Sequence, residues 1–215
     1  MSIVDAEKTG ADVDGRGRIL REARTHFTAQ GYAAVSMQQI ADAAAVNKAT
    51  LYHHFRDKED LFVAVMAEEL ARMTAEVAAA IGQGGTLREQ LRRVATHVFA
   101  SLQSDFGRLV SDLHEHVSER RRAELRSRGS PPWEQIRVAV QRAREAGEVR
   151  DIDPDLVARL FFGMVRSQIW WAKYDAGHPI ADDRLAETIA DLLMDGIVTR
   201  SSAQRSDFVA VIDDG

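Results

Sequence analysis

The sequence predicts an all-α fold with a small N-terminal helical segment and a larger C-terminal helical domain. Apolar residues recur at the three- and four-residue spacing of amphipathic helices along most of the 215 residues. No stretch shows the sustained alternation of a half-buried strand. Clusters of Gly, Pro and Asp divide the chain at "GQGG" (82–85), "GSPP" (129–132) and "DIDPD" (151–155).

The composition is that of an ordinary globular protein, with 45% hydrophobic and 28% charged residues. There is no cysteine, which excludes disulfides and a thiol nucleophile and favours a reducing compartment. No apolar run reaches the roughly 18 residues of a membrane span, and the N-terminus lacks the order of a signal peptide. These features favour a cytoplasmic protein without membrane contact.

Positive charge is concentrated in one short segment. The whole chain has a net charge of −5, whereas residues 16–58 contain seven Lys and Arg against three acidic residues. This local excess of basic charge is the first indication of a polyanionic partner.

The first helix is expected to follow a flexible arm at residues 1–15, which is polar and lacks apolar periodicity. The helical pattern begins near Gly17, with apolar residues at every fourth position from Ile19 to Phe27. Gly31 fits a helix C-terminus.

Two short helices follow. Ser36 and Gln39 have the spacing of a capping box, so a helix is expected to begin at Met37. After a tight three-residue link, Asn47 is a suitable N-cap for another short helix ending near Phe55.

Cap and stop residues place the remaining helices. Asp57 and Thr86 can each cap a helix, Gly147 fits a helix stop, and Pro154 suits a first helical position. The expected helices cover 58–81, 87–103, 106 to beyond 117 with a charged end, 133–146, 154–174 and 183–199, before a loose tail at 201–215.

The helix after Asn47 has two different faces. At 100° per residue, Leu51 and Phe55 share one face, and Ala49 and His53 fall on the opposite one. The first face anchors the helix and the second is offered outward. Two short helices joined by a tight link, the second exposing polar groups, describe a helix-turn-helix. The first turn of such a second helix usually reaches base edges.

On this pattern alone, alternatives to DNA binding remain open. Three short amphipathic helices with a basic face are common and do not require nucleic acid. Adjacent His53 and His54 point about 100° apart and lack a partner at ligand spacing. Asp112 and His116 lie four residues apart without a third ligand, so a solvated acidic face is favoured over a metal site. The sequence contains no catalytic motif such as G-x-S-x-G, a P-loop or H-E-x-x-H. We therefore expect neither enzymatic activity nor a cofactor.

The sequence of residues 27–66 resembles the DNA-binding half of the tetracycline-repressor (TetR) family of transcriptional regulators. It reads "FTAQGYAAVSMQQIADAAAVNKATLYHHFRDKEDLFVAVM". The matching motifs are "GY" at 31–32, "S-x-x-x-IA" at 36–41, "TLYHHF" at 50–55 and "KEDLF" at 58–62. The family often has Gly where this chain has Ala45 in the turn and Ala49 in the third helix.

The resemblance implies a helix-turn-helix DNA-binding domain at 16–62 and a ligand-binding and dimerisation domain at 63–200. Lys48 to Thr50 and His53 would meet bases, and the other matching residues would grip phosphate. The full set of implied DNA-binding residues is Ser36, Lys48, Ala49, Thr50, Tyr52, His53, His54 and Lys58.

The last two predicted helices carry more apolar residues than a peripheral helix should expose, which favours a homodimer. Gly163 would let a partner helix approach closely. The alternative is that both helices are buried within the monomer. The candidate interface residues are Leu156, Leu160, Gly163, Leu185, Ile189, Leu192 and Leu193. A two-fold dimer predicts a palindromic operator on double-stranded DNA.

Aromatic residues in the C-terminal domain suggest a pocket for a small hydrophobic effector, although aromatics at helical spacing more often form core. Candidate pocket residues are Phe106, Leu109, Val110, Leu113, Trp133, Met164, Gln168 and Trp171. Residues 145–163, "WWAKY" and "GHPI" are loosely similar to family members that respond to fatty acyl-CoA thioesters. Fatty acyl-CoA ranks as an effector below an unspecified hydrophobic molecule. The expected function is a ligand-responsive repressor. The alternative is a non-catalytic adaptor acting through protein contacts.

Overall fold

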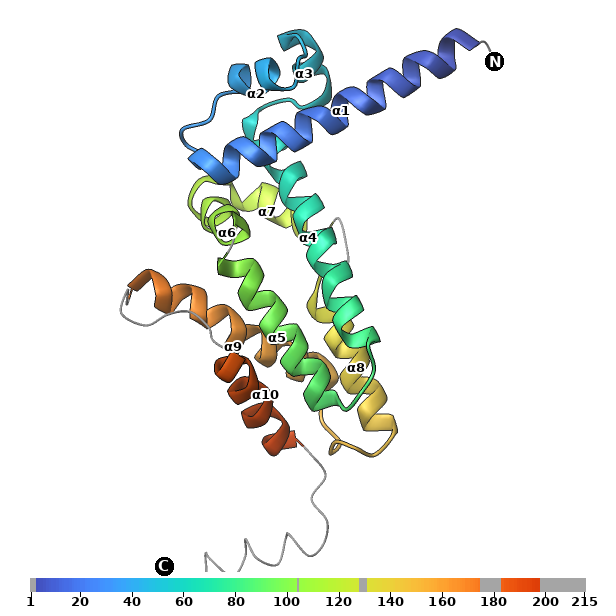
Figure 1. The fold of residues 1–215 in the computed structure, drawn as a ribbon, viewed down its shortest axis with the longest axis vertical. Coiled ribbons are helices and arrows are strands. Elements are labelled where there is room, and N and C mark those ends of the chain that lie inside the picture. Colours follow the sequence, from blue (N-terminus) through green and yellow to red (C-terminus); the bar gives the residue numbers. More distant parts are fainter. Residues whose placement is uncertain (1–2, 104, 128–130, 175–182, 198–215) are drawn as a thin grey trace, which may run out of the picture. The chain divides into compact units, whose positions relative to one another are not determined.

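A computed structural model gives the fold of the chain (Figure 1). It describes the backbone of residues 3–103, 105–127, 131–174 and 183–197. It describes the side chains of residues 15–101, 106–127, 131–167 and 184–197. These residues form ten α-helices and no β-strand, which confirms the all-α prediction. The helices are α1 (Ile3–Gln30), α2 (Met37–Ala43), α3 (Lys48–His54), α4 (Lys58–Gly82), α5 (Leu87–Gln103), α6 (Asp105–His116), α7 (Glu119–Ser127), α8 (Trp133–Glu145), α9 (Pro154–Tyr174) and α10 (Asp183–Ile197). None of the described helices has the length and apolar character needed to span a membrane.

The chain divides into two compact units, each built from separate stretches of sequence. The first unit contains residues 1–74 and 100–131, and the second contains residues 75–99 and 132–215. The first unit therefore includes α6 and α7 in addition to the three N-terminal helices.

The N-terminal helix is longer than the sequence predicted. α1 begins at Ile3, where a flexible arm was expected over residues 1–15. The arm was expected because residues 1–15 lack apolar periodicity. Such periodicity indicates that one face of a helix is buried, and a helix can form without it. The C-terminal stop is as expected: Gly31 has φ 84°, and its N–H donates to the carbonyl of Phe27 at 2.9 Å.

Aromatic packing forms the core of the first unit. Ile19, Ala23 and Phe27 of α1 are fully buried, as their four-residue spacing predicted. The ring of Phe62 packs edge-on against Phe27 and against Tyr32, both at 5.0 Å between centroids. Burying one such side chain contributes about 1.5–3 kcal/mol, so this cluster is a main support of the helix-turn-helix.

The predicted helix from Phe106 past Val117 is in fact two helices, α6 and α7. The break lies at Ser118, whose backbone N–H and hydroxyl both bond Oε1 of Glu59 at 2.6 Å. An amide used in this way cannot continue the helical ladder. Arg122 then donates to the carbonyl of His114 at 2.9 Å, which satisfies a free carbonyl at the end of α6.

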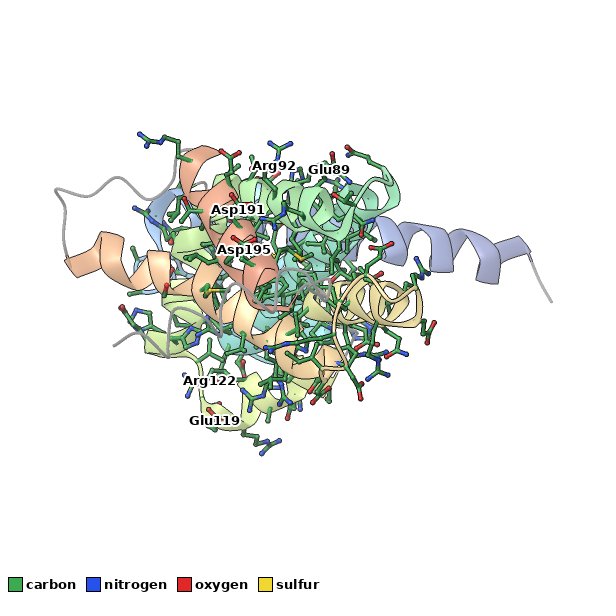
Figure 2. All side chains as sticks on the ribbon, turned by 90° about the horizontal axis from the view of Figure 1, so that it is seen from below. Glu89, Arg92, Glu119, Arg122, Asp191 and Asp195 are labelled. Carbon is green, nitrogen blue, oxygen red and sulfur yellow. The ribbon has the colours of Figure 1, made fainter. Side chains whose placement is uncertain are left out.

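The second unit is held by buried apolar side chains and by ion pairs at its surface. Val140 of α8 and Phe161 of α9 are fully buried. Arg88 of α5 pairs with Asp191 and, at 2.7 Å, with Asp195 on α10. Figure 2 labels these two aspartates one turn apart on α10. Exposed pairs of this kind usually contribute less than about 1 kcal/mol, so the apolar core dominates.

Candidate DNA-binding site

α2 begins with the capping box that the sequence predicted. Oγ of Ser36 accepts the backbone N–H of Gln39 at 3.2 Å, and Oε1 of Gln39 accepts the N–H of Ser36 at 2.8 Å. This reciprocal pair fixes where α2 starts. The Ser36 residue is exposed at that end of the helix, a position from which a hydroxyl can reach a phosphate oxygen.

The turn between α2 and α3 is a Schellman motif built without glycine. The N–H of Val46 donates to the carbonyl of Ala41 at 3.0 Å, and that of Ala45 donates to Asp42 at 3.1 Å. This pattern requires a left-handed residue after the helix cap, and Ala45 has φ 52°. The turn therefore carries backbone strain that glycine would avoid.

α3 is capped and seated as its sequence predicted. Oδ1 of Asn47 accepts the backbone N–H of Thr50 at 2.7 Å and the Thr50 hydroxyl at 3.0 Å. Leu51 is fully buried and Phe55 nearly so. Two anchors on one face and a side-chain cap at the start hold this seven-residue helix, which would be too short to be stable alone.

The opposite side of α3 presents polar and basic groups. Lys48, Ala49 and His53 are exposed, and the Tyr52 side chain is 42% exposed. The ammonium of Lys48 lies 5.9 Å from the centre of the Tyr52 ring. The structure thus brings these four predicted residues onto one open face, with the half-buried Thr50 in the same first turn.

His54 is turned inward more than the sequence suggested. It is half-buried, and its Nε2 has almost no accessible surface. A methyl group placed on Gly15 of α1 would lie 3.8 Å from that nitrogen. The ring therefore packs against α1, and a phosphate contact by His54 stays a prediction.

Lys58, also predicted to bind phosphate, is engaged within the chain. Its ammonium donates to the carbonyls of Tyr32 at 2.7 Å and Val35 at 2.8 Å, with Ala33 at 3.4 Å. It also lies 4.3 Å from the centre of the Tyr32 ring. Burial lowers the pKa of Lys58, and the charge of Asp112 partly opposes this. The structure uses Lys58 to tie the start of α4 to the α1–α2 connection.

Arg16 is a basic residue beside α3 that sequence reasoning did not assign to the site. It is exposed on α1, and its guanidinium carbon lies 5.4 Å from the centre of the Phe55 ring. Only its place in the basic segment 16–58 hinted at a role, because no spacing rule connects it to a helix 32 residues further on.

The Asp112 and His116 pair belongs to the structural support of this region. Oδ2 of Asp112 accepts the backbone N–H of Tyr32 at 2.8 Å, and His116 stacks on the Tyr32 ring at 5.5 Å. The His116 Nε2 lies 3.9 Å from Oδ1 of Asp112. Within the described ranges, no three His, Asp or Glu residues are arranged to hold a metal ion.

The residues predicted for an effector pocket lie in both units. Phe106 and Leu109 are buried in the first unit, with Val110 and Leu113 half-buried there. Trp133 and Met164 belong to the second unit. The side chains of Gln168 and Trp171 lie outside the described residues. The pocket therefore stays a prediction.

The predicted dimer residues separate into exposed and buried groups. Leu156, Leu160 and Leu192 are 44%, 51% and 67% exposed, and Gly163 is exposed beside them in α9. Leu185 is half-buried, whereas Ile189 and Leu193 are buried inside the second unit. The first group is available to a partner, and the last two pack the core of a single chain.

Comparisons with known proteins agree along most of the chain. Residues 19–65 match the bacterial regulatory proteins of the tetR family, and residues 81–193 match the tetracyclin repressor-like C-terminal domain. The HTH-type transcriptional repressor AcnR of Corynebacterium efficiens is 28% identical over 165 residues, which cover 77% of this chain and 83% of that protein.

Two solved structures share the fold. One, from Mesorhizobium loti and described as a TetR-family regulator, has a TM-score of 0.74 at 19% identity, covering 87% of this chain and 98% of that one. The other, FadR of Bacillus subtilis in complex with stearoyl-CoA, has a TM-score of 0.67 at 21% identity, covering 84% and 98%. On the two matched domains and the helix-turn-helix geometry, the chain belongs to the tetR family of bacterial regulatory proteins.

Proposed function

We propose that the chain is a cytoplasmic, ligand-responsive transcriptional repressor, without catalytic activity, that binds a palindromic operator as a homodimer. The observation that carries this proposal is the open face of α3, where basic, aromatic and small side chains project away from the Leu51 and Phe55 anchors. A major groove is wide enough to accept one such helix. The naming of AcnR as a repressor supports repression over activation.

The residues of this face divide by the chemistry they offer. We assign Lys48, Ala49, Thr50 and His53 to base edges, because the first turn of a recognition helix enters the groove first. The small side chain of Ala49 permits close approach to a thymine methyl. We assign Ser36 and Tyr52 to phosphate, as donors at the edge of the face. The phosphate contacts of His54 and Lys58 remain part of the proposal, although His54 packs against α1 and the Lys58 ammonium bonds carbonyls of the α1–α2 connection.

A homodimer is supported by the exposed leucines of the second unit. Leu156 and Leu160 lie four residues apart on one face of α9, and Leu192 is exposed on α10. Apolar side chains of this size are usually covered when they cluster. Two-fold symmetry would place two α3 helices in successive major grooves, about 34–36 Å apart. An operator with matching half-sites follows from that symmetry.

The effector is proposed to be a small hydrophobic molecule that lowers operator affinity. A ligand can do this only by binding the DNA-free arrangement of the dimer more tightly than the DNA-bound one. Fatty acyl-CoA is the specific effector that we propose. It is supported by the shared fold of FadR, which was solved with stearoyl-CoA. Among the predicted pocket residues, Phe106 and Leu109 of the first unit are apolar and would suit an acyl chain.

The DNA-binding part of the proposal is tested by operator affinity over a salt series. Operator DNA is first selected from source-genome fragments by the purified protein, and its affinity is then measured by fluorescence anisotropy. Lys48→Ala is expected to weaken operator binding by about 1–3 kcal/mol and to leave the salt slope nearly unchanged, because a base contact is lost and the phosphate contacts remain. Arg142→Ala, an exposed arginine on α8 in the second unit, is the matched control. Equal affinity of Lys48→Ala and wild type would refute the assignment of α3.

The effector part is tested separately with stearoyl-CoA, stearate and free coenzyme A. Release of the operator by stearoyl-CoA alone would support a thioester effector. Release by both stearoyl-CoA and stearate would show that the acyl chain is sufficient. No release by any of the three would exclude long-chain acyl-CoA as the effector and leave the DNA-binding proposal intact.

A further inference from the structure

We infer that α6 and α7 act as a brace that sets the pose of the α2–α3 pair on DNA, with Asp112 and Arg121 as its positioning residues. This inference rests on the proposed DNA-binding function. The brace belongs to the first unit, although it follows the helix-turn-helix by about 50 residues in sequence. Neither positioning residue lies on the exposed face of α3, so each would act through other residues.

The brace holds the connection that precedes α2. Oδ2 of Asp112 on α6 accepts the backbone N–H of Tyr32 at 2.8 Å. Arg108, one turn earlier on α6, donates to the carbonyls of Ala29 at 2.9 Å and Thr28 at 3.2 Å. These carbonyls end α1 and have no helical donor of their own. α6 thus fixes the point at which the chain leaves α1 for α2.

The brace also holds the connection that follows α3. Oδ2 of Asp60 accepts the backbone N–H of Arg56 at 3.2 Å, just after α3 ends. Oδ1 of Asp57 accepts the N–H of Asp60 at 2.7 Å and so caps α4. Arg121 on α7 reaches both carboxylates, at 3.3 Å to Asp60 and 3.4 Å to Asp57. Its guanidinium therefore joins α7 to the exit of the recognition helix.

Burial distinguishes this ion pair from the others on the surface. The Arg121 side chain is 9% exposed and that of Asp60 is 14% exposed. Burial alone would raise the pKa of Asp60, but the backbone N–H and guanidinium of Arg56, with the charge of Arg121, hold it below its usual range. Removing one partner of a buried pair leaves the other charge uncompensated. The Arg121–Asp60 pair therefore tolerates less displacement of its two charged groups than an exposed salt bridge does.

One end of the α2–α3 pair is therefore held by α6 and the other by α7. Lys58 adds a link between the two connections, because it begins α4 and bonds the carbonyls of Tyr32 and Val35. A recognition helix needs its side chains within a fraction of an ångström of productive geometry. A brace at both ends supplies that constraint, and its loss would let the pair tilt while its own caps and core stay intact.

The test compares Arg121→Met with Arg120→Ala, its neighbour on α7. Arg120 is 81% exposed and pairs only with Glu124 among the ion pairs the structure describes. Arg121→Met is expected to lose about tenfold or more in operator affinity, the change that 1.4 kcal/mol produces. Non-specific DNA binding and the salt slope should stay unchanged, because no phosphate contact is removed. Arg120→Ala should bind the operator as wild type does.

Each outcome decides the inference. A variant that is merely destabilised would lose specific and non-specific binding together, and a fall in salt slope by about one would mean that Arg121 touches phosphate. Either result, or wild-type operator affinity of Arg121→Met, would overturn the positioning role. Failure of wild type to bind any operator would instead sink the proposed function.

Two further variants extend the test, and the first of them keeps it decisive if Arg121→Met does not fold. Asp112→Ala removes the acceptor of the Tyr32 N–H at the other end of the brace and should give the same selective loss of operator affinity. Arg121→Met combined with Asp60→Asn removes both charges of the buried pair. If Arg121 acts through Asp60, the double variant should bind the operator no more weakly than the single one. Additive losses would contradict that route.

Discussion

Replacing Ala45 by glycine should stabilise the protein, although it removes a methyl group from the turn of the DNA-reading motif. Ala45 has φ 52°, and its N–H and that of Val46 both close the Schellman motif that ends α2. A left-handed residue other than glycine costs about 1–2 kcal/mol. Glycine gives back about 0.5–1 kcal/mol through the greater freedom of the unfolded chain. The expected net gain is about 0.5–1 kcal/mol.

This gain is measurable by urea unfolding followed by circular dichroism. For a chain of this size it corresponds to roughly 1–4 °C in Tm. The matched control is Ala43→Gly, an exposed residue at the last position of α2 with helical backbone. That change should destabilise by up to about 1 kcal/mol. Equal destabilisation by both substitutions would refute the assignment of strain to Ala45.

Three further predictions follow from the contacts described above. Lys58→Met should cost about 1–3 kcal/mol in urea unfolding, because it leaves the Tyr32 and Val35 carbonyls without their donor. Unchanged stability would show that water replaces it. The folded-state pKa of Asp60 is lowered, so its carboxylate stabilises the fold above about pH 3.9 and this stability is lost as pH falls through the folded pKa. Asp60→Asn should therefore lose less stability than wild type between pH 5 and pH 3, and an equal loss would contradict the shift. Leu160→Asp should yield monomers in sedimentation, whereas a persisting dimer would exclude α9 as the interface.

Local signals in the sequence were sufficient for most helix boundaries. Ser36 with Gln39 and Asn47 with Thr50 place side-chain caps within three residues of the amides they bind, and the structure shows both. The faces of α3 followed from Leu51 and Phe55 in the same way. Signals of this range depend on the chain within one or two helical turns, which is why they could be read without a structure.

Contacts between distant segments could not be read in this way. The break between α6 and α7 depends on Glu59, some 60 residues away from Ser118. The phosphate assignment of Lys58 stays a prediction, and the hydrogen bonds of its ammonium to carbonyls more than 20 residues away were not foreseen. Arg121 stood within the charged end of a predicted helix, and its ion pairs with Asp57 and Asp60 have no local signature.

The proposed function requires that a symmetric pair of these chains reads DNA through α3. It is tested most directly by selecting fragments of the source genome with the purified protein at near-physiological salt, and by repeating the selection with Lys48→Ala. We expect wild type to recover one palindromic sequence, with half-sites separated by one helical turn or a multiple of it, and the variant to recover it weakly or not at all. Recovery of unrelated fragments by wild type, or equal recovery by both proteins, would contradict it.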